Sequence, residues 1–112
     1  MVAFVNAERR AAGLRPLRTS PRLRARARST SRLLARGAPF RHGGLSWARR
    51  APGAQNLAMA PTTWSAFVGM IESPPHRRNM LGARWRSIGV GAAGDCNGLI
   101  YFTLNVSGAP RP

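Results

Sequence analysis

A chain of 112 residues forms one domain and can bury a packed core without metal or disulfides. No stretch approaches the roughly 20 apolar residues of a membrane span, and the single cysteine, Cys96, excludes an internal disulfide. The 18 basic residues, all arginine, outnumber the 3 acidic ones and give a formal net charge of +15. This charge predicts non-specific attraction to nucleic acid or anionic lipid at low salt, although uniform arginine use is also typical of a GC-rich coding sequence.

Residues 1–12 have the apolar spacing of a helix, and Gly13 follows as its C-terminal stop. The chain enters this helix directly, without the pattern of a signal peptide. We expect Glu8 to form a structural ion pair with Arg9, Arg15 or another arginine. A catalytic role for Glu8 would need a second acid nearby in the sequence, and none is present.

A second helix is predicted over residues 21–36. Ser20 is a typical N-cap, Pro21 suits the first helical position, and Gly37 ends the pattern. The buried stripe of this helix consists of Leu23, Ala27, Thr30 and Leu34. Its other faces carry Arg22, Arg24, Arg26, Arg28, Arg32 and Arg36. We expect these arginines to face solvent and not to bind the phosphates of a nucleic acid, because no aromatic side chain lies among them to stack on a base.

Residues 38–61 are rich in glycine, proline and alanine, which predicts a long ordered loop that walls a groove. Phe40, Leu45 and Trp47 are the expected anchors of this loop on the core. His42 lies within the loop, close to its start.

A third helix is predicted over residues 64–71, capped by Thr62 or Thr63. It should end near Glu72, because a proline follows two residues later. Its apolar stripe is expected in the core and consists of Trp64, Phe67, Val68 and Ile71.

His76 directly follows Pro74 and Pro75, which places it at a rigid corner between a helix and a loop. After a helical turn at residues 77–81, where Leu81 and Trp85 should pack inward, the pattern changes to strands.

Residues 87–92 and 99–106 predict an antiparallel hairpin with its turn at residues 94–98. Cys96 lies in this turn, and we expect it to be exposed and to have no role as a nucleophile. Residues 109–112 are expected to form a flexible tail, which leaves residues 1–108 as the domain.

Five short motifs occur in a fixed order along the chain: Val5-Asn6-Ala7-Glu8-Arg9, His42, Ala54-Gln55-Asn56-Leu57-Ala58, residues 73–81 and Ile88-Gly89-Val90-Gly91. In this order and spacing they resemble bacterial members of the CAP superfamily, which includes cysteine-rich secretory proteins, antigen 5 and pathogenesis-related proteins. The resemblance implies an α+β fold, an α-β-α sandwich in which a small antiparallel sheet of about three strands lies between helices.

In the resembled family, two histidines and two glutamates line a cleft that can hold a divalent metal. His42 and His76 match the two histidines, whereas Gln55 stands at the first glutamate. A carboxamide is a weak oxygen ligand and cannot act as a base, so the resemblance implies weak zinc binding at best. The second glutamate has no clear match, since prolines separate Glu72 from His76. The residues expected to support the groove are Glu72, Ser73, Asn56 and Asn79.

The resemblance favours a non-enzymatic monomer that binds a small apolar or lipid-like ligand, a polymer or a protein in a histidine-lined groove. It requires no cofactor and implies an extracellular or cell-envelope location, while the missing signal peptide leaves a cytoplasmic location open.

Two alternatives are a degenerate metal-dependent hydrolase and an arginine-rich domain that binds nucleic acid or other anionic polymers. No nucleophile and base pair is evident, because Ser46 and Ser73 lack an aspartate that would orient a neighbouring histidine. For the two histidines we favour a shared cleft over a pair of unrelated structural side chains, because of the motif match.

Overall fold

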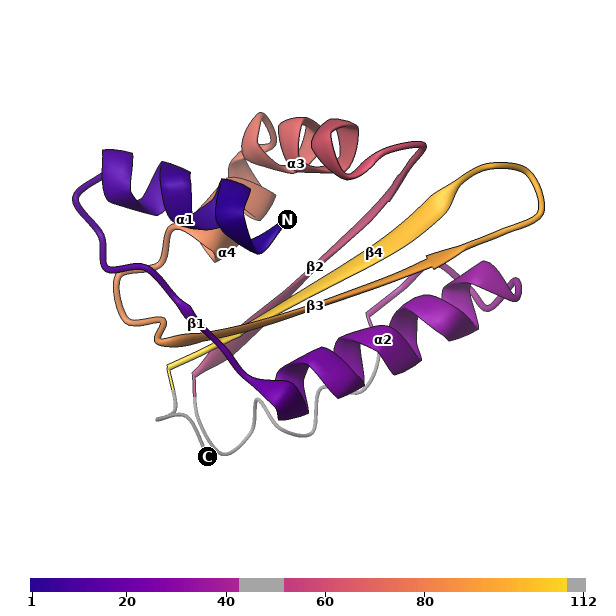
Figure 1. Ribbon diagram of the computed structural model, residues 1–112, viewed down its shortest axis with the longest axis horizontal. Coiled ribbons are helices and arrows are strands. Elements are labelled where there is room, and N and C mark those ends of the chain that lie inside the picture. Colours follow the sequence, from indigo (N-terminus) through magenta and orange to yellow (C-terminus); the bar gives the residue numbers. More distant parts are fainter. Residues whose placement is uncertain (43–51, 109–112) are drawn as a thin grey trace.

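A four-stranded sheet forms the middle layer of the computed structural model, which describes residues 1–42 and 52–108. Three helices, α1 (Val2–Ala11), α3 (Thr63–Ile71) and α4 (Pro74–Met80), lie on one face of this sheet. Helix α2 (Pro21–Ala35) lies on the opposite face (Figure 1). The predicted α-β-α sandwich is therefore confirmed.

The strands lie in the order β1-β3-β4-β2. Strands β3 (Ser87–Gly94) and β4 (Ile100–Ser107) form the predicted antiparallel hairpin, and β2 (Gly53–Ala60) pairs antiparallel with β4 along its whole length. Strand β1 (Arg18–Thr19) has two residues and pairs parallel with β3. The expected count of three antiparallel strands is therefore wrong, because this short parallel strand makes the sheet mixed.

The loop predicted over residues 38–61 is also wrong in part, since Gly53–Ala60 forms β2. This segment contains no β-branched or aromatic residue, so its sequence lacks the usual composition of a strand. Phe40 is 54% exposed and does not anchor the segment in the core. The other two expected anchors, Leu45 and Trp47, lie outside the described residues, as does the tail at 109–112.

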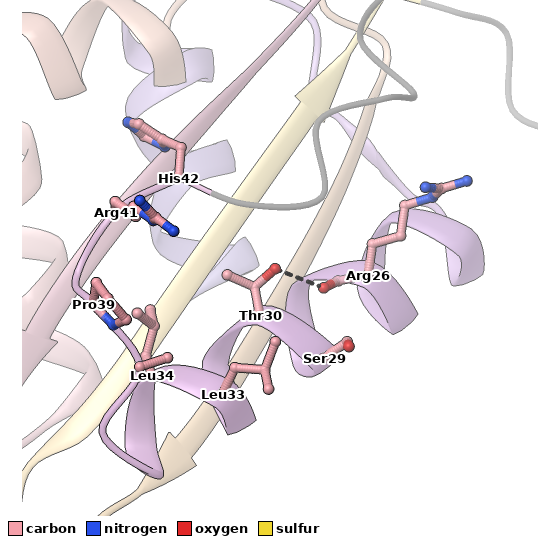
Figure 2. Close-up of a pocket in the computed structure, with 9 residues that line it drawn as sticks. Arg26, Ser29, Thr30, Leu33, Leu34, Pro39, Arg41 and His42 are labelled. Carbon is pink, nitrogen blue, oxygen red and sulfur yellow. Dashed lines mark hydrogen bonds between the residues drawn. The ribbon is translucent and has the colours of Figure 1, made fainter.

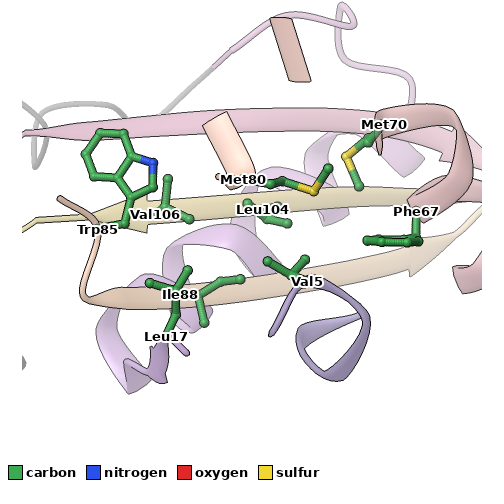
Figure 3. Close-up of a cluster of buried hydrophobic side chains, with 9 residues drawn as sticks. All are labelled: Val5, Leu17, Phe67, Met70, Met80, Trp85, Ile88, Leu104 and Val106. Atoms are coloured by element: carbon green, nitrogen blue, oxygen red, sulfur yellow. The ribbon is translucent and has the colours of Figure 1, made fainter. Parts of the chain in front are cut away.

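The main apolar core lies between the sheet and the layer of α1, α3 and α4 (Figure 3). It consists of Val5, Leu17, Phe67, Met70, Met80, Trp85, Ile88, Leu104 and Val106. Phe67 and Trp85 are buried as predicted, whereas Trp64 is 57% exposed. Trp64 sits in the first turn of α3, beside Phe4, where its ring packs edge-on at a centroid distance of 4.9 Å instead of entering the core.

The opposite face of the sheet packs against α2, whose buried residues are Leu23, Ala27, Ser31 and Leu34. A Cβ atom added at Gly89 would overlap the backbone of Leu23, and one added at Gly91 would overlap the backbone of Ala27. Helix α2 therefore lies directly on β3, at a distance that only glycine permits. Ser31 of α2 bridges this narrow layer, with its Oγ 3.1 Å from Gly91 O.

Helix α1 is attached by side chains of the motif that begins at Val5. Asn6 accepts from Leu17 N at 2.7 Å and donates to Leu17 O at 3.1 Å, so its amide pairs with the backbone as a neighbouring strand would. Glu8 lies 4.0 Å from Arg77 Nη1 in an exposed ion pair. The structural ion pair expected for Glu8 is therefore made with α4, far away in sequence.

Arg9 is fully buried and joins α1 to the end of α4. Its Nη1 donates to Met80 O and Gly82 O at 2.9 Å each, and burial, followed by the charge of Arg15, lowers the pKa of its guanidinium. The carbonyls at the C-terminus of a helix carry partial negative charge, which suits a buried cation. Arg9 thus caps α4 from another helix.

We predict that Gly91→Ala lowers the free energy of unfolding by about 2 kcal/mol, because the added methyl group pushes α2 away from β3. Urea denaturation measures this change. Gly69→Ala is the matched control, since its added Cβ meets nothing within 4 Å. In the interior of α3 this control should be neutral or stabilising by up to about 1 kcal/mol. Equal effects of the two variants would contradict the close approach of α2.

Candidate functional site

His42 stands at the end of a hydrogen-bonded chain that crosses the layer between the sheet and α2. Its Nδ1 lies 2.9 Å from Oε1 of Gln55, which is on β2. Gln55 Nε2 donates to Asn105 Oδ1 at 2.9 Å, and Asn105 Nδ2 donates to Leu23 O at 3.4 Å. Gln55 is only 5% exposed, whereas His42 is exposed. A buried polar row therefore connects the start of α2 to a surface imidazole.

The last acceptor fixes the direction of every hydrogen bond in this row. Leu23 O can only accept, so Asn105 must turn its amino group toward it and its oxygen toward Gln55. Gln55 must then donate with its amino group, which leaves its oxygen facing His42. The Nδ1 atom of neutral His42 therefore carries the proton, and Nε2 is the nitrogen with the free lone pair.

The neighbouring residue, Asn56, points to the other face of the sheet, since side chains alternate along a strand. Its Nδ2 donates to His76 O at 2.9 Å, and its Oδ1 accepts from Asn79 Nδ2 at 2.9 Å. His76 Nδ1 lies 2.8 Å from Ser73 Oγ. Asn56 thus holds α4 against β2, and His76 lies inside this helix instead of at a corner before a loop.

A pocket of about 410 Å³ opens beside His42, between α2 and the segment that follows it (Figure 2). Its floor is apolar, and Figure 2 shows Leu33, Leu34 and Pro39 grouped there. Arg26, Arg41, Ser29, Thr30 and His42 supply its polar lining. An apolar floor with a few polar groups at the rim is typical of a binding site for a small ligand.

Residues 2–106 match the family model described as CAP: Cysteine-rich secretory protein family. This chain belongs to the CAP family. No curated protein is similar enough to this CAP domain to match it.

Solved structures with the same fold come from several bacteria. An outer surface protein of Borrelia burgdorferi has a TM-score of 0.81 at 13% identity, covering 95% of this chain and 87% of that protein. An extracellular protein of Bacillus anthracis that contains an SCP domain has a TM-score of 0.76 at 20% identity, covering 96% of this chain and 38% of that one. A cysteine-rich secretory protein of Staphylococcus aureus has a TM-score of 0.77 at 21% identity, covering 96% and 37%. At these identities the likeness shows the fold alone.

The site residues predicted for this CAP domain fall into two groups. His42 and Gln55 are in contact on the α2 side of the sheet, whereas Ser73, Asn56 and Asn79 surround His76 on the side of α4. Convergence of the two imidazoles on one cleft stays a prediction. Glu72 is exposed at the C-cap of α3, and its supporting role also stays a prediction.

Sequence reasoning missed the residues that link the pocket side to α2. Asn105 lies in the middle of a strand that otherwise looks apolar, and its partner Leu23 uses only a backbone oxygen. Ser31 and Thr103 form a second buried contact in the same layer, with their hydroxyl oxygens 2.8 Å apart. The alternation of polar and apolar side chains along β4 could have indicated these residues, because Thr103 and Asn105 occupy the face opposite Leu104.

We predict that neutral His42 is protonated on Nδ1, as the hydrogen-bonded row requires. Proton–nitrogen correlation spectra of the imidazole rings distinguish the two tautomers directly. Gln55→Leu removes the acceptor and should return His42 to the Nε2–H form, which free histidine prefers. Asn79→Ala, on the other face of β2, serves as the control and should leave His42 unchanged. An Nε2–H tautomer in the unmodified protein would contradict the deduced direction.

Proposed function

We propose that this CAP domain is a non-enzymatic binding module that takes a small amphiphilic ligand, with an apolar tail and an acidic head, in the pocket beside His42. The observation that carries this proposal is the lining of the pocket. Leu33, Leu34 and Pro39 offer an apolar surface to a tail. Arg41 offers a guanidinium group that pairs bidentately with a carboxylate or phosphate head, whereas the guanidinium of Arg26 extends away from the other lining residues (Figure 2).

The positions of the acids support a binding role over a hydrolytic one. Glu8 pairs with Arg77, and Asp95 accepts backbone hydrogen bonds within the β3–β4 turn. Glu72, the remaining acid, is exposed. In the described part of the chain, neither imidazole makes a hydrogen bond to a carboxylate that could orient it or share its proton. General acid–base catalysis by these histidines would lack that partner.

A location outside the cell or at its surface is part of the proposal. It is supported by family membership and by the description of the similar bacterial structures as outer surface or extracellular proteins. None of the helices in the described ranges is long and apolar enough to cross a membrane.

Binding of laurate, a twelve-carbon fatty acid, tests the pocket. Isothermal titration calorimetry should detect binding by the unmodified protein. Leu33→Glu should weaken it about tenfold or more, because a carboxylate on the apolar floor repels both the tail and the head. Met59→Glu is the matched control, since Met59 is similarly exposed but lies on β2 and does not line the pocket. Unchanged binding in Leu33→Glu, or equal loss in both variants, would refute the proposal.

We also propose that the two histidines give the domain weak affinity for zinc. Within residues 1–42 and 52–108, no three His, Cys, Asp or Glu side chains come together as a metal site. Both imidazoles have Nδ1 engaged within the protein, so Nε2 is the nitrogen that each would offer to the ion. The oxygen of Gln55 already accepts from His42, which favours a positioning role for Gln55 over direct ligation.

Zinc titration by calorimetry tests whether the histidines act together. If the two imidazoles share one ion, His42→Ala and His76→Ala should each lower the zinc affinity about tenfold or more, because the ion loses one of two imidazole ligands in either variant. Circular dichroism shows whether each variant keeps its fold. If one variant binds zinc as the unmodified protein does while the other fails, the two rings do not share an ion.

A further inference from the structure

Helix α2 and its C-cap residue, Arg36, carry six arginines and no acidic residue. Four arginines recur at intervals of four residues, which places them in one row along the helix: Arg24, Arg28, Arg32 and Arg36. Arg22 and Arg26 add a second, shorter row. All six are exposed, and the sequence contains no acid between Glu8 and Glu72.

These arginines work against the stability of the helix that carries them. Like charges at i and i+4 destabilise a helix, and each neighbouring pair in the row has this spacing. The described residues contain a single ion pair, between Glu8 and Arg77, and it lies on the other side of the sheet. An anionic partner outside the chain would relieve the repulsion along α2.

Two large apolar side chains lie beside this charge. Leu33 on α2 is 55% exposed, and Phe40, just beyond the helix, is 54% exposed. Exposed apolar groups flanked by arginines suit a bilayer surface, because the apolar groups enter the acyl boundary while guanidinium groups contact lipid phosphates. A nucleic-acid duplex offers no such apolar phase and would leave Leu33 and Phe40 in contact with water.

We propose that α2 docks this domain onto an anionic phospholipid bilayer through the arginine row and the apolar pair Leu33 and Phe40. The arginine row is separate from the ligand pocket, since Arg24, Arg28, Arg32 and Arg36 do not line it, whereas Leu33 borders both surfaces. The guanidinium groups supply most of the attraction, which is therefore sensitive to salt. The apolar pair supplies a smaller contribution that salt does not screen.

Cosedimentation with vesicles tests the proposal. The unmodified protein should bind vesicles of phosphatidylcholine and phosphatidylglycerol at a ratio of 7:3 much more strongly than vesicles of phosphatidylcholine alone. Arg28→Glu with Arg32→Glu should lower this binding by at least about tenfold. The reversal creates favourable i,i+4 pairs with Arg24 and Arg36, so α2 itself is not weakened.

The control variant, Arg10→Glu with Arg78→Glu, makes the same change of net charge on helices of the opposite layer. It should lower binding by less than about threefold, because its charges do not face the bilayer. Equal losses in the two double variants would overturn the assignment to α2. Laurate binding should survive in Arg28→Glu with Arg32→Glu, which separates this proposal from the pocket.

The apolar contribution is tested with Leu33→Ser and Phe40→Ser combined, against Met59→Ser and Trp64→Ser, which are similarly exposed elsewhere. At 0.5 M salt, where charge attraction is largely screened, only the first combination should abolish the remaining vesicle binding. Absence of vesicle binding by the unmodified protein overturns the proposal. So does tight binding of a DNA duplex that the α2 variants abolish while vesicles are not bound.

Discussion

The direct contact of α2 with β3 is the constraint on which the rest of the structure depends. Gly89 and Gly91 leave no side chain between the helix and the strand, so the two backbones approach closely. The buried residues of α2 that surround this contact are Leu23, Ala27, Ser31 and Leu34. Ser31 and Asn105 make their hydrogen bonds across this layer because the backbone of the opposite element is within reach. The same layer leads to Gln55 and, through it, to the imidazole beside the pocket.

The two faces of the sheet therefore contribute to the structure in different ways. The face toward α1, α3 and α4 buries the large apolar side chains that drive folding, while the face toward α2 fixes orientation through hydrogen bonds. Strand β2 serves both, because consecutive residues point in opposite directions. Gln55 reaches His42 on one side and Asn56 holds α4 on the other. The adjacent amide side chains of Gln55 and Asn56 therefore make their contacts on opposite faces of the sheet.

Much of the fold could be predicted from local signals. Ser20, Pro21 and Gly37 define the ends of α2, and Thr62 caps α3. The hairpin was visible in its alternating strands, and the motif order indicated the family. Strand β2 was not predictable from composition, since its stability comes from pairing with β4 and not from β-forming residues. The ion-pair partner of Glu8 and the carbonyls of α4's end that accept from Arg9 were equally hidden, because they lie more than 60 residues away in sequence and only the folded chain brings them together.

The exclusive use of arginine for positive charge has a consequence of its own. A guanidinium group stays protonated throughout the pH range in which proteins remain folded, so acidification or mild alkali leaves the positive charge of the arginines unchanged. Acetyl transfer to ε-amines, which neutralises many basic proteins, has no target along a chain without lysine. Ionic strength is then the principal environmental variable that controls how far the positive field extends into solution.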